Sequence, residues 1–326
     1  MSVVYFVIPC YNEEEVLPET VKRLSEKLEQ LISDGIASKE SRMLFVDDGS
    51  KDKTWELIEK FSSDNKYVGG VKLSRNRGHQ NALLAGLMTA RGKCDCVISL
   101  DADLQDDIGV IDEFVLKYQD GCEVVYGVRS SREKDTAFKR GTAQGYYKFM
   151  AALGVEIVYN HADYRLLGSR ALDALAEYKE VNLFLRGIVP LIGFRSDYVY
   201  YERSERFAGE SKYPLKKMIR FAVDGITSFS VKPLKIISNA GIIICILSFI
   251  FFIYAIVSVI TGSSVAGWAS LMCSIWFLGG IQMLGIGIVG TYVGKIYSES
   301  KHRPRFIIDK TIISGITDKE KESAGQ

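Results

Sequence analysis

The sequence predicts an α/β domain with a mostly parallel sheet, joined to a two-helix transmembrane anchor. Up to Gly127, apolar runs suited to buried strands alternate with segments whose apolar residues recur at helical spacing. From Ile236 to Gly294 the chain contains no Asp, Glu, Lys, Arg or His, although these charged types are frequent elsewhere. The first pattern is typical of a parallel sheet covered by helices on both faces, and the second of membrane-spanning helices.

The predicted strands and helices alternate along the chain. Strands are expected at Val3–Ile8, Met43–Val46, Val68–Leu73, Cys96–Leu100 and Val124–Gly127. Helices are expected from Glu13 onward, around Trp55–Phe61, and at Asn81–Ala90 and Ile108–Tyr118. Ligands of such sheets bind beyond the carboxyl ends of the strands, so the residues that follow each strand are the first place to look for a site.

Composition excludes two broad classes of protein. The 41 Lys and Arg residues nearly balance the 40 Asp and Glu residues, giving a formal net charge of +1. A nucleic-acid-binding protein usually has a basic excess, so no nucleic-acid partner is expected. Hydrophobic residues make up 47% of the chain, which is too many for a disordered protein.

The uncharged block holds two stretches long enough to cross a bilayer, about Ile236–Ile260 and Trp268–Gly294. Two buried core helices are the alternative, but core helices of this length are rare. Basic residues flank the pair on both outer sides, and the turn between the spans has none. The positive-inside rule therefore predicts a multi-pass protein of the cell membrane, with its large domain and both termini in the cytoplasm.

These features divide the chain into four parts. We expect a cytoplasmic domain over residues 1–212, a juxtamembrane region over 213–234, the two spans within 235–295 and a cytoplasmic tail over 296–326. The pattern of Pro214–Phe229 predicts a basic amphipathic helix suited to an anionic membrane surface. Gly290 and Gly294 have the spacing of close helix packing, which suggests a homo-oligomer. In the tail, RFIIDKTI is expected to form a short strand or to lie on the large domain.

Acidic residues follow three of the predicted strands. The segments are Pro9–Glu13, Asp47–Ser50 and Asp101–Asp106, and all three should meet at one edge of the sheet. A single acidic pair at a strand end is usually a helix cap. Three such groups on one rim suit a hard divalent cation, because Mg²⁺ uses one or two carboxylates together with substrate phosphates. Carboxylates at this edge can also accept hydrogen bonds from a base or a ribose.

Several segments resemble a known family. IPCYNEEE, VDDGSKDKT, LSRNRGHQNALLAG and DADLQD, in this order and spacing, resemble the family-2 glycosyltransferases of GT-A fold. VVYGVRSSRE, DYRLLGSRAL and RSERFAGESKYPLKKMIRFAVDGI, followed by two spans, are similar to the polyprenyl-phosphate glycosyltransferases. That group includes dolichyl-phosphate mannose synthases and bactoprenol glucosyltransferases. The QxxRW motif of processive synthases is absent, since none of the three Trp residues follows an Arg.

The resemblance implies a role for each matching residue. Nucleotide-sugar binding falls to Pro9, Tyr11, Asn12, Glu13, Asp47, Asp48, Asp101, Ala102, Asp103, Gln105, Arg206, Ser211 and Lys212. Asp103, Gln105 and Asp101 would hold Mg²⁺ or Mn²⁺. Arg129, Arg140 and Arg165 would bind the acceptor phosphate. The catalytic group would comprise Asp103, Arg165 and Asp163, with Asp163 either taking a proton or only orienting Arg165.

The expected activity is therefore inverting transfer of a sugar from a UDP-sugar to undecaprenyl or another polyprenyl phosphate. Glucose and N-acetylglucosamine are the leading sugars, and the product would serve cell-envelope glycosylation. Three alternatives stay open: a family-2 transferase with a protein or polysaccharide acceptor, a mannose synthase that uses GDP-mannose, and a non-catalytic membrane scaffold.

Overall fold

The computed structural model describes residues 1–130, 161–181, 184–202, 232–261 and 267–313. The chain divides into two compact units. The first consists of Met1–Tyr147, Ile157–Lys212 and Pro304–Gln326, and the second of Lys148–Glu156 and Tyr213–Arg303. The segment from Pro304 onward therefore belongs to the same unit as the N-terminal domain.

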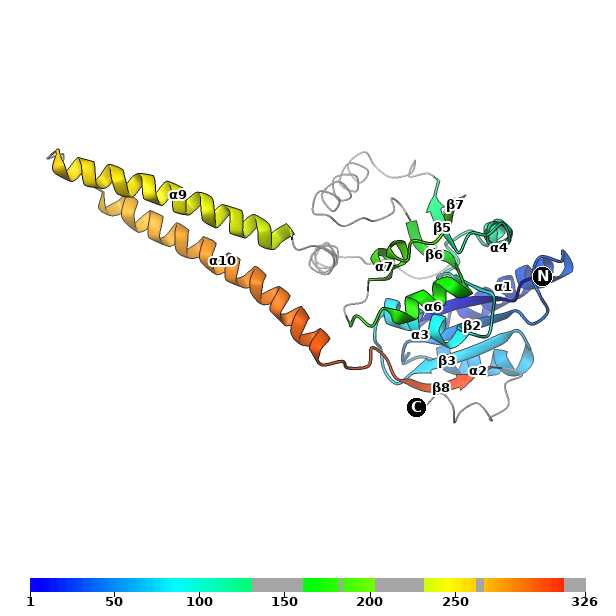
Figure 1. Ribbon diagram of the computed structural model, residues 1–326. Coiled ribbons are helices and arrows are strands. Elements are labelled where there is room, and N and C mark those ends of the chain that lie inside the picture. The colour runs from blue at the N-terminus through cyan, green and yellow to red at the C-terminus, as the bar shows by residue number, and fades with distance from the viewer. Residues whose placement is uncertain (131–160, 182–183, 203–231, 262–266, 314–326) are drawn as a thin grey trace. The chain divides into compact units, whose positions relative to one another are not determined.

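The first unit is built on a mostly parallel sheet, which in the described part of the chain has the strand order β7-β5-β6-β4-β1-β2-β3-β8 (Figure 1). β6 runs antiparallel to β4 and β5, and β8 runs antiparallel to β3, while the other pairings are parallel. The strands are β1 (Val4–Cys10), β2 (Arg42–Asp47), β3 (Val68–Leu73), β4 (Cys96–Ser99), β5 (Val124–Arg129), β6 (His161–Gly168), β7 (Ser196–Tyr201) and β8 (Ile308–Ile312). All five strands expected before Gly127 are confirmed.

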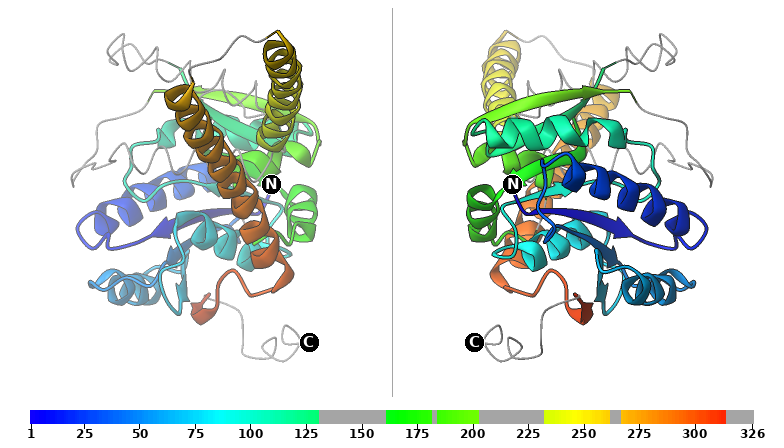
Figure 2. Two further views of the ribbon diagram at one scale, coloured as in Figure 1. Left: turned by 90° about the vertical axis from the view of Figure 1, so that its left-hand side faces the viewer. Right: turned by 90° about the vertical axis from the view of Figure 1, so that its right-hand side faces the viewer.

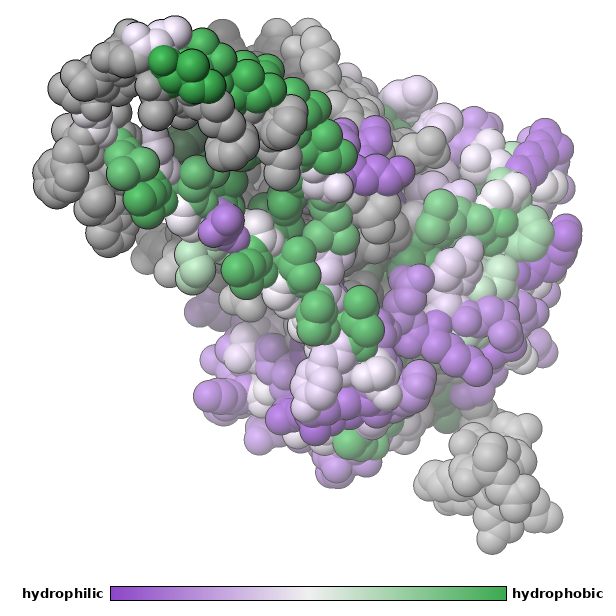
Figure 3. All heavy atoms as spheres, turned by 60° about the vertical axis from the view of Figure 1, so that its left-hand side comes forward, coloured by the Kyte–Doolittle hydropathy of each residue, from purple (hydrophilic) through white to green (hydrophobic). Residues whose placement is uncertain are grey.

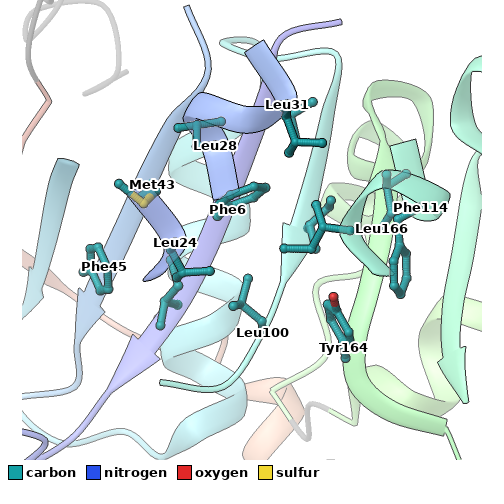
Figure 4. Packing of buried hydrophobic residues seen from close by; sticks show 14 of the residues in the cluster. Phe6, Leu24, Leu28, Leu31, Met43, Phe45, Leu100, Phe114, Tyr164 and Leu166 are labelled. Carbon is teal, nitrogen blue, oxygen red and sulfur yellow. The ribbon is translucent and has the colours of Figure 1, made fainter. Parts of the chain in front are cut away.

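Helices cover both faces of this sheet (Figures 1 and 2). They are α1 (Leu17–Ser33), α2 (Thr54–Asp64), α3 (His79–Ala90), α4 (Ile111–Gln119), α6 (Ser169–Glu177) and α7 (Leu185–Leu191), with a 3₁₀ turn η1 (Ile108–Val110) before α4. The apolar face of α1 packs on alternate side chains of β1 and β2, as Figure 4 shows for Leu24, Leu28 and Phe6. On the opposite face Gly86 of α3 is so close to the sheet that a Cβ there would lie 2.4 Å from Val7 Cγ1.

The first helix begins later than its sequence predicts. Glu13 was expected to open it, but α1 starts at Leu17, next to Pro18 in the first turn. The backbone N–H groups of Glu13 and Glu14 instead donate to Thr54 Oγ1 and Asp52 Oδ2, at 2.9 and 3.2 Å. These contacts with a loop distant in sequence hold the acidic segment at the sheet edge rather than in a helix.

The C-terminal strand β8 brings the chain back to the large domain. It pairs with β3, and the Ser74 N–H donates to Ile307 O at 2.9 Å. The Arg305 guanidinium donates to Tyr178 O, and Lys310 Nζ lies 3.6 Å from Glu59 Oε1. RFIIDKTI was expected to form a short strand or to lie on the large domain, and both are confirmed by β8 and its pairing with β3.

The second unit contains two long helices, α9 (Lys232–Ile260) and α10 (Trp268–Ser300), which pack side by side (Figures 1 and 2). Among the described residues, the segment Phe277–Ser300 is long and apolar enough to cross a membrane, and an 18-residue stretch within it has a mean hydropathy of 1.5. Figure 3 shows hydrophobic side chains exposed along this unit, in contrast to the largely hydrophilic surface of the first. Both predicted spans lie within these helices, the first in α9 and the second in α10. A crossing by α9, and with it the two-helix anchor, stays a prediction. The amphipathic segment Pro214–Phe229 lies outside the described residues.

Candidate active site

Strand register brings the three acidic segments to one edge of the sheet. Cys10 at the end of β1 is the parallel partner of Asp47 at the end of β2. β4 lies on the other side of β1, and the Leu100 N–H donates to Val7 O at 3.2 Å. The chain therefore leaves all three strands on the same rim, as the alternation of strands and helices predicts.

The loops after β1 and β2 are hydrogen-bonded to each other. The Asn12 N–H donates to Ser50 Oγ at 3.0 Å, and Asn12 Oδ1 accepts from the Lys51 N–H at 2.9 Å. Asn12 has a positive φ of 53°, which Asn tolerates better than most residues. Its side chain thus shapes the rim, whereas Tyr11 beside it is exposed and Pro9 is buried at the end of β1.

Asp47 and Asp48 both support the loops of the rim. Asp47 is fully buried, and its Oδ1 accepts from the Ser50 N–H at 3.1 Å. The two carboxylate oxygens of Asp48 accept from the N–H groups of Arg77 and Gly78, at 2.7 and 2.8 Å. Burial raises the pKa of both carboxyls. Asp48 therefore ties down the loop that precedes α3.

The segment Asp101–Asp106 follows β4 in a turn. Leu104 takes a positive φ of 55°, which is uncommon for a branched residue. Asp103 is nearly buried and its Oδ1 accepts from the Gln105 N–H at 3.2 Å, while the Ala102 carbonyl accepts from Thr20 Oγ1 at 2.7 Å. Burial raises the pKa of Asp101 to about 6. His79 opposes this shift, and the neighbouring carboxylates of Asp106, Asp163 and Asp103 add to it.

The described residues contain no group of three or more His, Cys, Asp or Glu side chains placed to hold a metal ion by themselves. Asp101 and Asp103 nevertheless stand two residues apart on a tight turn at the rim. This arrangement fits an ion that takes one or two protein carboxylates and completes its coordination with phosphate oxygens and water. It does not fit a cage built from protein ligands alone.

A second charged cluster lies next to this turn, on β6. Arg165 is the antiparallel partner of Ser99 on β4, and Ser99 Oγ donates to the Asp163 carbonyl at 2.5 Å. The Asp163 carboxylate accepts from the Arg165 guanidinium, and from Nε and Nη2 of Arg186 at 3.2 and 3.1 Å. His79 Nε2 is 3.5 Å from Asp163 Oδ2 and 3.7 Å from Asp101 Oδ1. His79 therefore links the two clusters.

These contacts set the charge state of Asp163. Burial by itself would raise its pKa, but Arg186, His79 and Arg165 together hold the pKa of this carboxyl well below its ordinary value. A carboxylate offers about four acceptor positions, and the two arginines and His79 direct four donor contacts to them. The geometry favours an orienting role for Asp163 over that of a proton acceptor.

Arg165 lies deeper than its expected role suggests. The residue is 1% exposed, and its Nη1 donates to the Leu185 carbonyl at 3.4 Å. Burial lowers the pKa of its guanidinium and Asp163 opposes that shift. Arg165 therefore holds Asp163 and the start of α7 from the interior of the domain, and its guanidinium is not exposed to solvent.

Arg129, the other described candidate for the acceptor phosphate, occupies a separate position at the end of β5. Its Nη2 is 3.8 Å from Asp106 Oδ1, and its Nε donates to the Tyr201 hydroxyl at 3.4 Å. Arg140, Arg206, Ser211 and Lys212 lie outside the described residues.

Sequence reasoning missed His79 and Arg186. His79 was within reach, because it begins α3 just after the carboxyl end of β3, where rim residues are expected. Arg186 gave no such signal. It lies on α7, whose first residue, Leu185, makes two tertiary contacts. The Leu185 N–H donates to Gln80 Oε1 at 3.1 Å, and the Leu185 carbonyl accepts from Arg165 Nη1. Only these contacts bring Arg186 close to Asp163.

Residues 5–175 match the sequence model of the family described as Glycosyl transferase family 2. The chain is 56% identical over 307 residues to the uncharacterized glycosyltransferase YkoT of Bacillus subtilis, covering 94% of this chain and 91% of that protein. It is 39% identical over 304 residues to the bactoprenol glucosyl transferase of Shigella phage SfV, covering 93% and 96%. A solved structure of glucosyl-3-phosphoglycerate synthase from Mycobacterium tuberculosis, in complex with Mn²⁺, UDP-glucose and phosphoglyceric acid, aligns with a TM-score of 0.43 and 17% identity, covering 70% and 78%.

Proposed function

This chain belongs to glycosyltransferase family 2, and we propose that it moves a sugar, glucose or N-acetylglucosamine, from a UDP-sugar to a polyprenyl phosphate. It is a glycosyltransferase with an α/β fold of GT-A type. The observation that carries the choice of acceptor is the similarity over nearly the whole chain to a relative named bactoprenol glucosyl transferase. The apolar segment Phe277–Ser300 supports this choice of acceptor, because a polyprenyl phosphate is embedded in a membrane and the enzyme must bind it there.

The donor would bind at the rim described above. In this proposal Tyr11, Glu13 and Asp48 border the base and Asp101 the ribose, with the remaining nucleotide-sugar residues around them. Asp101, Asp103 and Gln105 would hold Mg²⁺ or Mn²⁺ against the donor diphosphate. When bound, the cation supplies positive charge that stabilises the leaving diphosphate.

The transfer needs little help from a base. An oxygen of the acceptor phosphate attacks C1 of the sugar, the bond from C1 to the diphosphate oxygen breaks, and the nucleoside diphosphate leaves with that electron pair. A single displacement inverts the configuration at C1. Because the second pKa of a phosphate monoester is near 6, the nucleophile is already an anion at neutral pH. This agrees with an Asp163 whose acceptor positions are filled by cationic donors.

The same proposal places the protein in the cell membrane as a two-pass homo-oligomer with a cytoplasmic catalytic domain. The basic residues on either side of the uncharged block from Ile236 to Gly294 support this orientation. Accessibility of single cysteines introduced at Ser263 and Lys301 in intact cells would test it. Labelling of Lys301→Cys from outside would contradict the orientation.

The activity is tested on the full-length protein in detergent, with undecaprenyl phosphate, Mg²⁺ or Mn²⁺, and a panel of UDP- and GDP-sugars. Mass spectrometry of the lipid fraction is expected to show one hexosyl or N-acetylhexosaminyl polyprenyl phosphate from a UDP-sugar. A mannosyl lipid formed from GDP-mannose would contradict the proposal and would identify the protein as a mannose synthase. No lipid product from folded protein with any donor would reject it in favour of another acceptor or a scaffold.

A further inference from the structure

The segment Asp101–Asp107, which follows β4, carries the carboxylates proposed to bind the donor, and we call it the donor segment. It belongs to no helix or strand, so side chains of other elements help to hold its shape. Thr20 Oγ1 on α1 donates to the Ala102 carbonyl at 2.7 Å, and the Tyr164 hydroxyl on β6 donates to the Asp107 carbonyl at 3.0 Å. These two contacts hold the donor segment near its start and at its end.

The ring of Tyr164 is packed on two sides. The residue is 1% exposed. Its ring centroid is 4.7 Å from that of Phe114 on α4, which Figure 4 shows beside it, and 5.2 Å from that of Tyr201 on β7, in an edge-to-face arrangement. Because these neighbours restrict the ring, the hydroxyl has a fixed direction, toward the Asp107 carbonyl.

Strand β5 approaches Tyr164 closely at a glycine. A Cβ on Gly127 would lie 2.8 Å from the Tyr164 carbonyl oxygen and 3.1 Å from Tyr164 Cδ1. The register of β5 against β6 shifts between Tyr126 and Val128, at this same glycine. A glycine inside a strand often marks such a close approach of another backbone. The neighbouring strand therefore also restricts the position of Tyr164.

Strand β6 reaches both ends of the donor segment. Successive residues of a strand point to opposite faces of the sheet, so Asp163 and Tyr164 lie on different sides of it. Asp163 Oδ2 is 3.5 Å from His79 Nε2, which lies 3.7 Å from Asp101 Oδ1 at the start of the segment. Tyr164 contacts Asp107 at its end. One strand thus relates the two ends of the donor segment to each other.

We propose that Tyr164 is a positioning residue for donor binding. Its hydroxyl fixes the end of the donor segment, so that the Asp101 and Asp103 carboxylates are in place before the nucleotide sugar arrives. Preorganisation of this kind favours binding, because the ligand does not have to order the segment. The inference rests on the proposed function for the identity of the ligand, whereas the contact between Tyr164 and the segment is independent of it.

Tyr164→Phe keeps the ring and removes only the hydroxyl, so steady-state kinetics of this variant in the full-length enzyme test the proposal. Loss of one hydrogen bond should raise the KM for the UDP-sugar by about 3- to 10-fold. The KM for polyprenyl phosphate should stay unchanged, because the segment that Tyr164 holds is proposed to bind the donor. A purely structural residue would not separate the two KM values.

Tyr118→Phe is a closely matched control. The Tyr118 hydroxyl also donates to the backbone carbonyl of an aspartate, Asp95, at the same distance of 3.0 Å. Asp95 precedes β4, so this bond lies at the opposite end of that strand from the donor segment. Tyr118→Phe should leave both KM values unchanged. An unchanged KM for the UDP-sugar in Tyr164→Phe, or equal rises in the KM values of both substrates, would overturn the proposal.

Hydrogen–deuterium exchange separates this inference from the proposed function, because it needs neither nucleotide nor metal. Peptides covering residues 100–108 should exchange about 3-fold faster or more in Tyr164→Phe than in the wild type, and at the wild-type rate in Tyr118→Phe. If the wild type makes no glycosylated lipid but this difference is seen, the proposed function is wrong and Tyr164 still positions the segment. If lipid product forms and the three proteins exchange alike, the positioning role is rejected while the function stands.

Discussion

The hydroxyl of Tyr201 donates a hydrogen bond to Asp106 Oδ1 at 2.6 Å, which joins strand β7 to the turn that carries Asp101 and Asp103. Both residues are buried, and the Arg129 guanidinium approaches the same carboxylate oxygen. Burial, and then the charge of Asp106, raises the pKa of Tyr201, which stays protonated as the donor. The turn proposed to bind the donor is thus held in place by a hydrogen bond from β7, the strand at one edge of the sheet.

Tyr201→Phe should destabilise the domain by about 1.5–3 kcal/mol, because it removes a hydrogen bond to a buried charged group. Chemical denaturation measures the change. Tyr198→Phe, on the same strand but exposed, should change the unfolding free energy by no more than about 0.5 kcal/mol. Equal effects of the two changes would show that the Asp106 contact adds nothing to stability.

Gly49→Ala should destabilise the rim and reduce transfer. Gly49 has a φ of +69°, and a Cβ there would lie 2.6 Å from the backbone of Arg75 and Asn76, at the start of the loop leading to His79. Gly92→Ala is a matched control, since Gly92 has a φ of +75° with no atom within 4 Å of a Cβ. Backbone strain alone costs about 1–2 kcal/mol in each. Thermal unfolding should show a larger loss for Gly49→Ala, and only that variant should lose activity.

Asp163→Asn should alter the pH dependence of stability. The pKa of Asp163 is depressed in the folded state, so its ionisation stabilises the protein above the pKa of the unfolded chain. That contribution is lost as the pH falls through the depressed folded value. The variant should be less stable at pH 7 by about 3–5 kcal/mol, because it leaves cations without their partner.

Melting temperatures of the wild type and Asp163→Asn, measured from pH 7 down to pH 3, give the comparison. The gap between the two proteins should be widest near neutral pH and should narrow below about pH 4, where the unfolded chain begins to bind the proton. A constant gap over the whole range would show that the charge of Asp163 does not stabilise the fold.

Asp103→Asn should lower metal-dependent turnover by about 100-fold or more, because it removes a negative ligand from the proposed cation site. The assay follows lipid product at increasing Mg²⁺ or Mn²⁺ concentration. Asp173→Asn, an exposed carboxylate that pairs with Arg91, should retain full activity. Full activity of Asp103→Asn would remove Asp103 from the proposed metal site.

Local pattern determined much of this protein. The apolar runs predicted the first five strands, and parallel alternation with helices placed Pro9–Glu13, Asp47–Ser50 and Asp101–Asp106 at one rim, because successive parallel strands end on the same side. The uncharged block from Ile236 to Gly294 predicted long apolar helices. The length and hydrophobicity of such a block are properties of the local sequence and do not depend on tertiary contacts.

Only the tertiary structure decided which charges meet. β6 enters antiparallel between β4 and β5, which sets Asp163 beside the turn at Asp101, and α7 docks from a later part of the chain to add Arg186. The exposure of two arginines that the sequence does not distinguish also differs: the side chain of Arg165 is buried, and that of Arg186 is partly exposed. Such outcomes depend on contacts between residues distant along the chain, and neither hydrophobic period nor motif spacing contains them.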